Sequence, residues 1–455
     1  MAKAAASRRV ALALLGDIRR RDAYAREVLR GSERMDALEP RDRALAERLV
    51  MGVMGSYGLL DATLGRHVKS GARLEPRVRD ALRMSTYELL FLAAPDAVAV
   101  SQGVELVRSI RPRAAGMANA VLRKVALEDV PARARAVELA HGQAATVGDL
   151  ALVSGYPAWL LEKIWRQRGV STATAFALSA LDPAPVFVAD MSPLRGREEG
   201  ETRSVLAAQH LEPHDTDVSG AYRIGAPAGL FRSGLVQNGD IVVADLSAQL
   251  VALMVDPAPD KYVLEIGQGR GTKSLIMEAA AMRRGGAMRM VGVDALAHKT
   301  KASRNRMRAA GISDRVRCLT LDGTTIGDGA AAKELEGPFD AVLVDAPCSG
   351  TGTLRRHPER AWALVPGDVD HRLSASLPSL QLSLLEAAAS QVGDEGLLCY
   401  ATCSVLREEN EDIVEAFLAS EIGSGFERVG EPFVTSPVAG GPDGHFCMRL
   451  RSRRR

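Results

Sequence analysis

The chain has 455 residues, of which 47% are hydrophobic and 25% charged, and its formal net charge at pH 7 is +2. This composition is typical of globular proteins, and a chain of this length divides into two to four domains. No apolar run approaches the roughly 20 residues of a membrane span, which excludes an integral membrane protein. Five cysteines without a secretion signal indicate free thiols in a reducing compartment, so we expect a cytoplasmic protein. For the oligomeric state, a monomer is the default expectation.

The positive charge is concentrated at the N-terminal end. Residues 1–130 carry 23 Lys and Arg against 16 Asp and Glu, and nearly all of these cations are arginine. Arginine binds phosphate groups with paired hydrogen bonds, and basic surfaces attract nucleic acid. A solvated helical surface has the same charge pattern, so charge alone leaves nucleic-acid binding open.

The N-terminal part of the chain, residues 1–130, has its apolar residues at helical spacing, which predicts an all-helical module. Helix boundaries are expected at Pro40, Pro95 and Pro112, because proline does not fit inside a helix. Residues 131–240 begin with a helix near 157–168 and continue with short alternating runs among Pro and Gly turns. We predict a helical linker and a small α+β unit there.

From residue 241 to the end, the pattern changes to strand, turn and helix in alternation, which predicts a Rossmann-like α/β domain with a mostly parallel sheet. The fold class is therefore multidomain, with all-α, small α+β and α/β parts in chain order. The predicted strands of the last part are 262–266, 290–293, 316–321, 339–344, 396–401 and 446–450.

A glycine-rich turn follows the first of these strands. Gly267, Gly269 and Gly271 allow a sharp turn and a close approach of the backbone to a ligand, and the helix that begins near Thr272 presents unpaired N–H groups. This spacing alone is a weak signal, since a plain strand-to-helix turn has it too.

Two carboxylates strengthen the prediction of a cofactor site. Asp294 ends the next strand, where it can accept hydrogen bonds from ribose hydroxyls, and Asp322 follows the third strand, where it can meet an adenine amino group or cap a helix. NAD and an adenosyl cofactor both fit these positions. The two thiols described next favour S-adenosylmethionine, because hydride transfer has no evident need for them.

Two cysteines follow strand patterns in the second half of the sheet. Cys348 lies in the segment Asp345–Gly352, and Cys403 lies in Tyr400–Ser404. Parallel strands place their carboxyl ends at one edge of the sheet, where open α/β folds bind ligands. Cys318, Cys399 and Cys447 are expected in the core, and no grouping of Cys and His has the spacing of a metal site.

A thiolate beside a methyl donor suggests covalent catalysis. Carbon 5 of cytosine becomes nucleophilic once a thiolate has added to carbon 6, and a second residue then assists release of the thiol. Asp345 is placed to hydrogen-bond the base, and Lys273 is placed to lower the pKa of a nearby thiol. From the residues alone, catalysis and core packing remain equal alternatives for Cys348 and Cys403.

The two cysteine segments resemble motifs of the RNA cytosine-5 methyltransferases. The matching segments are Asp345–Gly352, Arg355–Glu359, Tyr400–Ser404 and Glu408–Asn410. The resemblance implies that Cys403 attacks the base and that Cys348 assists product release. It also implies a class I methyltransferase domain with S-adenosylmethionine held by this set: Glu265, Gly267, Gln268, Gly269, Gly271, Lys273, Asp294, Asp322 and Asp345.

The N-terminal module resembles the NusB-like helical domain through Arg41–Arg43, Asp80–Arg83, Tyr87–Leu90 and Asn119–Arg123. The combination of this module with a cytosine-5 methyltransferase domain resembles a known family arrangement. It implies an RNA-binding domain at 1–130, an RRM-like unit at 131–240 and a catalytic domain at 241–455. The implied substrate is a cytosine in small-subunit ribosomal RNA, with transfer RNA as an alternative.

The cofactor turn departs from the family pattern Asp-x-Cys-Ala-Ala-Pro-Gly-Gly-Lys-Thr. Residues 265–274 read Glu-Ile-Gly-Gln-Gly-Arg-Gly-Thr-Lys-Ser instead. This departure keeps open a non-catalytic RNA-binding factor in ribosome assembly or antitermination. The intact cysteine segments argue against that alternative.

Overall fold

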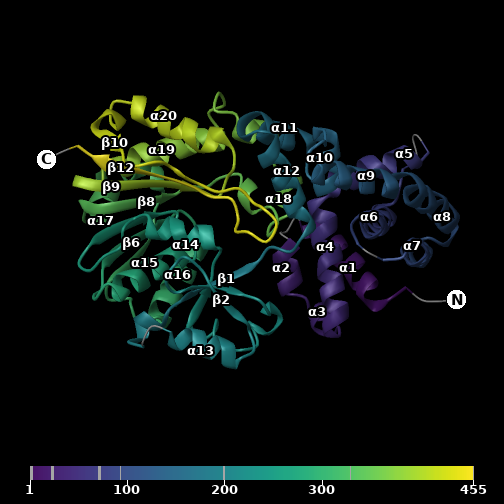
Figure 1. Ribbon diagram of the computed structural model, residues 1–455, viewed down its shortest axis with the longest axis horizontal. Helices are drawn as coiled ribbons and strands as arrows, with labels where there is room; N and C mark the ends of the chain where they lie inside the picture. Colours follow the sequence, from purple (N-terminus) through teal and green to yellow (C-terminus); the bar gives the residue numbers. More distant parts are fainter. Residues whose placement is uncertain are drawn as a thin grey trace. The chain divides into compact units, whose positions relative to one another are not determined.

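The computed structural model describes residues 4–21, 25–69, 73–92, 94–197, 200–327 and 329–453. The chain forms two compact units (Figure 1). The helical unit consists of Met1–Pro183 and a later segment, Leu354–Val365. The sheet unit consists of Ala184–Thr353 and Pro366–Arg455.

The helical unit is built from amphipathic helices whose boundaries agree with the proline positions. Pro40 is the first residue of α4, Asp96 begins α7 after Pro95, and Pro112 begins a 3-10 turn. The helices are α1 (Ala6–Arg21), α2 (Ala25–Arg30), α3 (Glu33–Asp36), α4 (Pro40–Gly55), α5 (Tyr57–His67), α6 (Pro76–Phe91), α7 (Asp96–Ile110), α8 (Ala115–Lys124), α9 (Val130–His141), α10 (Val147–Ser154), α11 (Ala158–Arg168), α12 (Val170–Leu178) and α18 (Arg360–Ala363).

Apolar residues of α1, α4, α6 and α7 form the core of this unit, and α6 is buried along most of its length. The predicted helix near 157–168 is confirmed as α11. Helices α9 to α12 group with the N-terminal helices rather than with the small sheet that follows them. The boundary that we predicted at residue 130 falls where a π-helical turn, Val125–Asp129, runs directly into α9.

A small antiparallel sheet begins the sheet unit. Its strand order is β2-β3-β1-β4, and α13 (Glu201–Ala208) lies between β1 and β2 in the chain. The short alternating runs predicted in this region are confirmed as two of its strands. The four strands are β1 (Val186–Asp190), β2 (Pro213–Asp215), β3 (Ala221–Ile224) and β4 (Ile241–Val243).

The larger sheet has the order β10-β12-β9-β8-β5-β6-β7, with β11 paired to β12. Strands β5 to β9 are parallel and the last three are antiparallel, so all six predicted strands are confirmed within a mixed sheet. They are β5 (Tyr262–Ile266), β6 (Arg289–Asp294), β7 (Val316–Thr320), β8 (Phe339–Asp345), β9 (Val392–Thr402), β10 (Phe426–Arg428), β11 (Phe433–Val434) and β12 (Phe446–Ser452).

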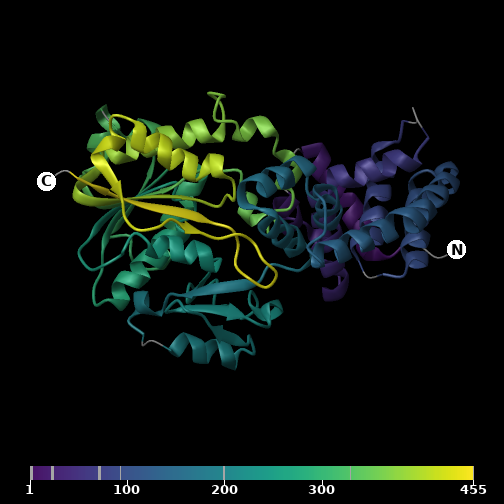
Figure 2. The same cartoon turned by 45° about the horizontal axis from the view of Figure 1, so that its top comes forward.

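Helices cover both faces of this sheet, as Figures 1 and 2 show. On one face lie α14 (Leu246–Leu253), α15 (Thr272–Arg283) and α16 (Ala297–Ala309), over a core that contains the buried thiols Cys318, Cys399 and Cys447. On the other face lie α17 (Gly329–Leu335), α19 (Leu377–Ala389) and α20 (Glu411–Ala419). The expected Rossmann-like architecture is confirmed. In the described part of the chain, every helix falls short of the length and hydrophobicity of a membrane span.

Candidate active site

Two thiols meet at the carboxyl ends of β8 and β9, which are adjacent parallel strands. The Sγ atoms of Cys348 and Cys403 are 3.2 Å apart, and the backbone N–H of Cys403 donates to Cys348 Sγ at 3.3 Å. Cys348 is 8% exposed, whereas Cys403 is only partly buried. The hydrogen bond with Cys403, together with burial, raises the pKa of Cys348 well above its ordinary value. Cys348 therefore keeps its proton at neutral pH, and Cys403 is the more accessible sulfur.

A buried carboxylate, Glu409, joins the loops that carry the two thiols. It lies in a 3-10 turn, Arg407–Glu409, and is fully buried. Its oxygens accept hydrogen bonds from the N–H of Ser349 at 2.7 Å and from the hydroxyls of Ser349 and Ser404 at 2.5 Å each. Gln381 Nε2 donates to it at 3.1 Å. Ser349 and Ser404 each follow a cysteine directly, so one side chain fixes both loops.

The residues alone did not reveal this role of Glu409. The resemblance included the segment Glu408–Asn410 but gave it no function. The one available signal was that segment's position a few residues after Cys403.

Lys273 and Asp345 form an ion pair, with Nζ 2.6 Å from Oδ2. Burial by itself lowers the pKa of Lys273, but the charge of Asp345 and the hydrogen bond between them outweigh it, so the pKa of Lys273 is raised. Lys273 also interacts electrostatically with Cys403. Lys273 therefore interacts with both Asp345 and Cys403. Cys403 in turn contacts Cys348, so all four residues predicted for catalysis are connected.

The glycine turn joins β5 to α15, and its glycines have left-handed φ angles. At Gly267, with φ of 80°, an added Cβ would lie 2.2 Å from the carbonyl oxygen of Asp345, so only glycine fits there. At Gly269 the Cβ position is almost open, because its nearest neighbour is 3.9 Å away. A ligand can therefore approach the backbone closely at Gly269.

Glu265 and Gln268 lie beneath this turn in a buried polar cluster. The Ser274 hydroxyl donates to Glu265 Oε2, and Gln268 Nε2 donates to Ser274 Oγ at 2.9 Å. Burial raises the pKa of Glu265 to about 7. Among the described residues, Gln268 Oε1 has no hydrogen-bond partner. This buried acceptor is free to receive a hydrogen bond from a bound molecule.

The two predicted carboxylates differ in their surroundings. Asp294 is 7% exposed, and its Oδ2 and Oδ1 accept the N–H groups of Gly269 at 3.0 Å and Leu296 at 2.9 Å. It is thereby fixed against the glycine turn. Asp322 is exposed and caps the 3-10 turn Gly323–Thr325 through Thr324, as the helix-cap alternative predicted.

Arg306 of α16 donates hydrogen bonds to the part of the turn that departs from the family pattern. Its Nη1 donates to the carbonyl oxygen of Arg270 and to Thr272 Oγ1, both at 2.8 Å. The sequence gave no signal for this contact, which joins residues 36 positions apart. Arg306 therefore holds the turn at both Arg270 and Thr272.

No group of three or more Cys, His, Asp and Glu side chains with the geometry of a metal site occurs within the described ranges. The residues described above are two thiols, an ion pair, carboxylates and a glycine-rich turn.

This combination defines the class of the molecule: a Rossmann-like methyltransferase domain joined to a helical domain. Comparison with protein families gives the same division. The model of the 16S rRNA methyltransferase RsmB/F family matches residues 252–425, and the NusB family model matches residues 5–127.

Similar proteins extend over nearly the whole chain. Ribosomal RNA small subunit methyltransferase B of Thermus thermophilus is 30% identical over 458 residues, which cover 99% of this chain and 98% of that protein. The protein of the same name from Xanthomonas campestris is 31% identical over 407 residues, covering 88% and 85%. The chain therefore belongs to the RsmB/F family of ribosomal RNA small subunit methyltransferases, as the cysteine motifs and the NusB-like module predicted.

The crystal structure of PH0851 has the same fold over 97% of each chain, with a TM-score of 0.73 and 22% sequence identity. At this identity the likeness concerns the fold alone.

Proposed function

We propose that this protein transfers a methyl group from S-adenosylmethionine to carbon 5 of a cytosine in small-subunit ribosomal RNA, through a covalent bond between Cys403 and the base. The observation that carries the proposal is the pair of thiols 3.2 Å apart at the carboxyl edge of a methyltransferase sheet. Membership of the RsmB/F family supports ribosomal RNA as the substrate.

The cofactor fits the residues of the glycine turn. Gly269 offers an open backbone, Asp294 is fixed beside it with lone pairs left for ribose hydroxyls, and Gln268 Oε1 is a buried acceptor. When bound, S-adenosylmethionine supplies an electrophilic methyl group. Gly267 and Gly271 shape the turn, and the part of Glu265, Gly267, Gly271 and Asp322 in cofactor binding belongs to the proposal.

Cys403 starts the reaction. Its thiolate forms a bond to carbon 6 of the base, which shifts the electron pair of the 5,6 double bond and makes carbon 5 nucleophilic. The positive charge of Lys273 favours the thiolate. Asp345, held in place by Lys273, hydrogen-bonds the ring as charge develops on it.

Cys348 serves the release step. After methylation, carbon 5 loses its proton to a base, the carbon 6–sulfur bond breaks, and the electron pair returns to Cys403. Cys348 lies beside the leaving sulfur and keeps its proton, so its S–H can donate a hydrogen bond to Cys403 as the electron pair returns to that sulfur. A base inside a duplex cannot reach these groups, so the target cytosine must be unpaired or flipped out.

The test uses tritiated S-adenosylmethionine and unmethylated small-subunit ribosomal RNA transcribed in vitro. We expect label transfer by the wild type, no RNA–protein adduct with Cys403→Ala, and a denaturation-resistant adduct with Cys348→Ala. Cys318→Ala is the matched control, because this thiol is buried in the core, where its partner is the Ser303 hydroxyl, and the variant should keep its activity.

Three results would contradict the proposal. Label in transfer RNA but not in ribosomal RNA would change the substrate, and absence of cofactor binding would favour a non-catalytic assembly factor. An adduct that persists in Cys403→Ala would reverse the roles of the two thiols.

A further inference from the structure

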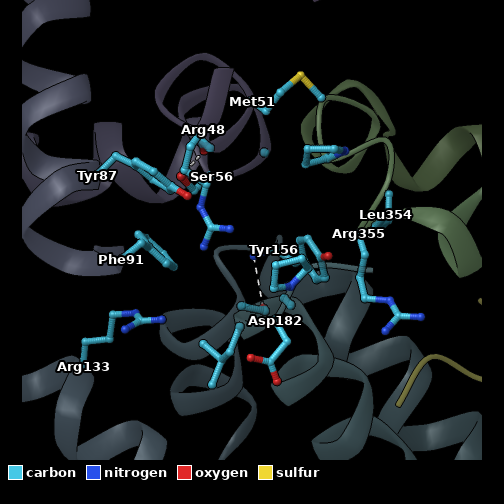
Figure 3. Close-up of a pocket in the computed structure, with 17 residues that line it drawn as sticks. Arg48, Met51, Ser56, Tyr87, Phe91, Arg133, Tyr156, Asp182, Leu354 and Arg355 are labelled. Atoms are coloured by element: carbon cyan, nitrogen blue, oxygen red, sulfur yellow. Dashed lines mark hydrogen bonds between the residues drawn. The ribbon is translucent and has the colours of Figure 1, made fainter. Parts of the chain in front are cut away.

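The helical unit contains a cavity of about 140 Å³, and the arginines that line it point in different directions (Figure 3). Arg133 donates to the carbonyl oxygens of Leu152 and Val153, and Arg355 extends away beyond Tyr156. These cations therefore do not converge on one ligand. Two buried amides of the sheet unit, in contrast, bond to the residues directly beside the two thiols.

Asn410 bridges the two residues that flank Cys403. The Thr402 hydroxyl donates to Asn410 Oδ1 at 2.5 Å, and Asn410 Nδ2 donates to the carbonyl oxygen of Ser404 at 2.9 Å. The Asn410 side chain is fully buried, so water does not compete for these bonds. Both ends of one amide are thus used, one on each side of the cysteine, and the amide fixes the backbone that carries Cys403.

The turn that carries Asn410 is itself attached to β9. The Tyr400 hydroxyl donates to the carbonyl oxygen of Glu409 at 2.6 Å, and Tyr400 belongs to this strand. Since Cys403 directly follows the same strand, Asn410 and the thiol are positioned by one rigid element.

Gln381 of α19 holds the residue that precedes Cys348. Its Nε2 donates to the carbonyl oxygen of Pro347 at 2.9 Å and to Glu409 Oε1 at 3.1 Å. The side chain is fully buried, and its Oε1 has no hydrogen-bond partner among the described residues. Rotation of the amide by half a turn would place Oε1 against these two acceptors. The donors therefore stay on the loop, although the amide oxygen remains unpaired.

The bond from Gln381 to Pro347 bears directly on Cys348. The carbonyl group of Pro347 and the Cα atom of Cys348 lie in one plane, because the peptide bond is planar. Fixing this carbonyl oxygen therefore fixes the direction from which the Cys348 side chain leaves the backbone.

We propose that Asn410 and Gln381 are positioning residues that act on different steps of the reaction. Asn410 orients Cys403 for attack on the base, and Gln381 orients Cys348 for release of the product. The identity of the two steps rests on the proposed function. Because both amides are fully buried, each acts through a thiol rather than on the substrate.

The test uses full-length variants that change these bonds and little else. Asn410→Asp keeps the acceptor for Thr402 but places an oxygen against the carbonyl oxygen of Ser404. Gln381→Met keeps the length of the side chain and removes the donor to Pro347 without adding a charge.

Gln391→Met is the matched control. Gln391 is also a buried amide, and its Nε2 donates to the carbonyl oxygen of Ile326 at 2.9 Å. It directly precedes β9, at the end of the strand opposite to the thiols. The control thus loses a similar hydrogen bond in the same unit. Urea unfolding of all three variants measures how much stability each one loses.

We expect the two variants to fail at different steps in methyl transfer to unmethylated small-subunit ribosomal RNA. Displacement of a reacting group lowers a rate by about tenfold to a hundredfold. Asn410→Asp should lower kcat/KM by this factor and form little RNA–protein adduct. Gln381→Met should lower kcat by this factor and accumulate a denaturation-resistant adduct. Gln391→Met should keep the kcat and the adduct level of the wild type, and the Kd for S-adenosylmethionine should be unchanged in all three.

A second measurement needs neither RNA nor cofactor. Diamide accepts two electrons and two protons as a bond forms between the Sγ atoms of Cys348 and Cys403, and the rate depends on how the two thiols approach each other. Asn410→Asp and Gln381→Met should form this disulfide more slowly than the wild type. Gln391→Met should form it at the rate of the wild type.

The outcomes separate this proposal from the proposed function. If Asn410→Asp and Gln381→Met oxidise and methylate like Gln391→Met, neither amide positions a thiol. If both variants accumulate the adduct, or both lack it, the amides do not act on separate steps. If the wild type does not methylate the RNA, the proposed function fails, whereas slower oxidation of both variants still supports the positioning of the thiols.

Discussion

The Sγ atoms of Cys348 and Cys403 lie 3.2 Å apart although the two residues are separated by 55 positions in the chain. The two thiols are close because β8 and β9 pair in parallel, so the loops that carry them begin at the same edge of the sheet. A disulfide bond of about 2 Å requires only a small further approach of the two sulfurs.

This distance predicts a reversible loss of activity on mild oxidation. Diamide should accept two electrons and two protons from the thiol pair and join Cys348 to Cys403, which removes the nucleophile. We expect methyl transfer to stop and dithiothreitol to restore it. The number of free thiols in the denatured protein should fall from five to three, because the other three thiols are buried in the core.

Cys348→Ala is the control for that thiol count, since it leaves Cys403 without a partner and should lose no pair on treatment. Retention of all five thiols in the oxidised wild type, with activity unchanged, would show that the loops do not bring the sulfurs together in solution.

Glu409 is expected to act as a positioning residue. Its carboxylate accepts hydrogen bonds from the Ser349 and Ser404 hydroxyls and from the Ser349 N–H. In Glu409→Gln, an amide NH2 faces donors, which costs about 1–3 kcal/mol and displaces the thiols. We expect kcat to fall by about tenfold to a hundredfold, with the Kd for S-adenosylmethionine unchanged.

The neighbouring variant Glu408→Gln provides the control, because Glu408 is only partly buried and should tolerate the change. Equal kcat in the two variants would refute the positioning role. A loss of cofactor binding in Glu409→Gln would instead indicate a general disruption of the fold.

The strands, and the position of the two thiols at one edge of the sheet, could be predicted from the sequence because both depend on patterns among neighbouring residues. The strands are continuous apolar runs, and the cysteines follow two of them, so the parallel sheet brings them to one edge. The contacts that could not be predicted join distant positions. Glu409 reaches Ser349 across 60 residues, and Arg306 reaches Arg270 across 36. Which distant polar groups pair depends on packing that no local pattern encodes.

Glu265 predicts a dependence of stability on pH. Burial raises its pKa in the folded chain to about 7 from an ordinary 4.5. The folded state therefore binds the proton more tightly than the unfolded state, so the free energy of unfolding falls as pH rises from about 4.5 to about 7 and levels off above that. Over this pH range, Glu265 alone lowers the free energy of unfolding by at most about 3 kcal/mol.

Glu265→Gln should remove that contribution while keeping a partner for Ser274. Urea unfolding followed by far-ultraviolet circular dichroism, between about pH 5 and pH 8, measures the difference between variant and wild type. Glu334→Gln, at an exposed position, should give a curve parallel to the wild type. A Glu265→Gln curve that is also parallel would mean that the carboxyl ionises normally.

The segment that follows the Pro-Cys motif should be sensitive to one glycine of α5. A Cβ at Gly58 would lie 2.1 Å from the ring of Trp362, whereas a Cβ at Gly65 of the same helix would meet nothing within 4 Å. We expect Gly58→Ala to destabilise the helical unit by about 1–3 kcal/mol through overpacking. Gly65→Ala should stabilise it by about 0.5–1 kcal/mol, since alanine favours a helix.

Urea unfolding followed by tryptophan fluorescence suits this comparison, because all three tryptophans, Trp159, Trp165 and Trp362, belong to the helical unit. If the two alanine variants unfold at the same urea concentration, the segment Leu354–Val365 does not pack on α5.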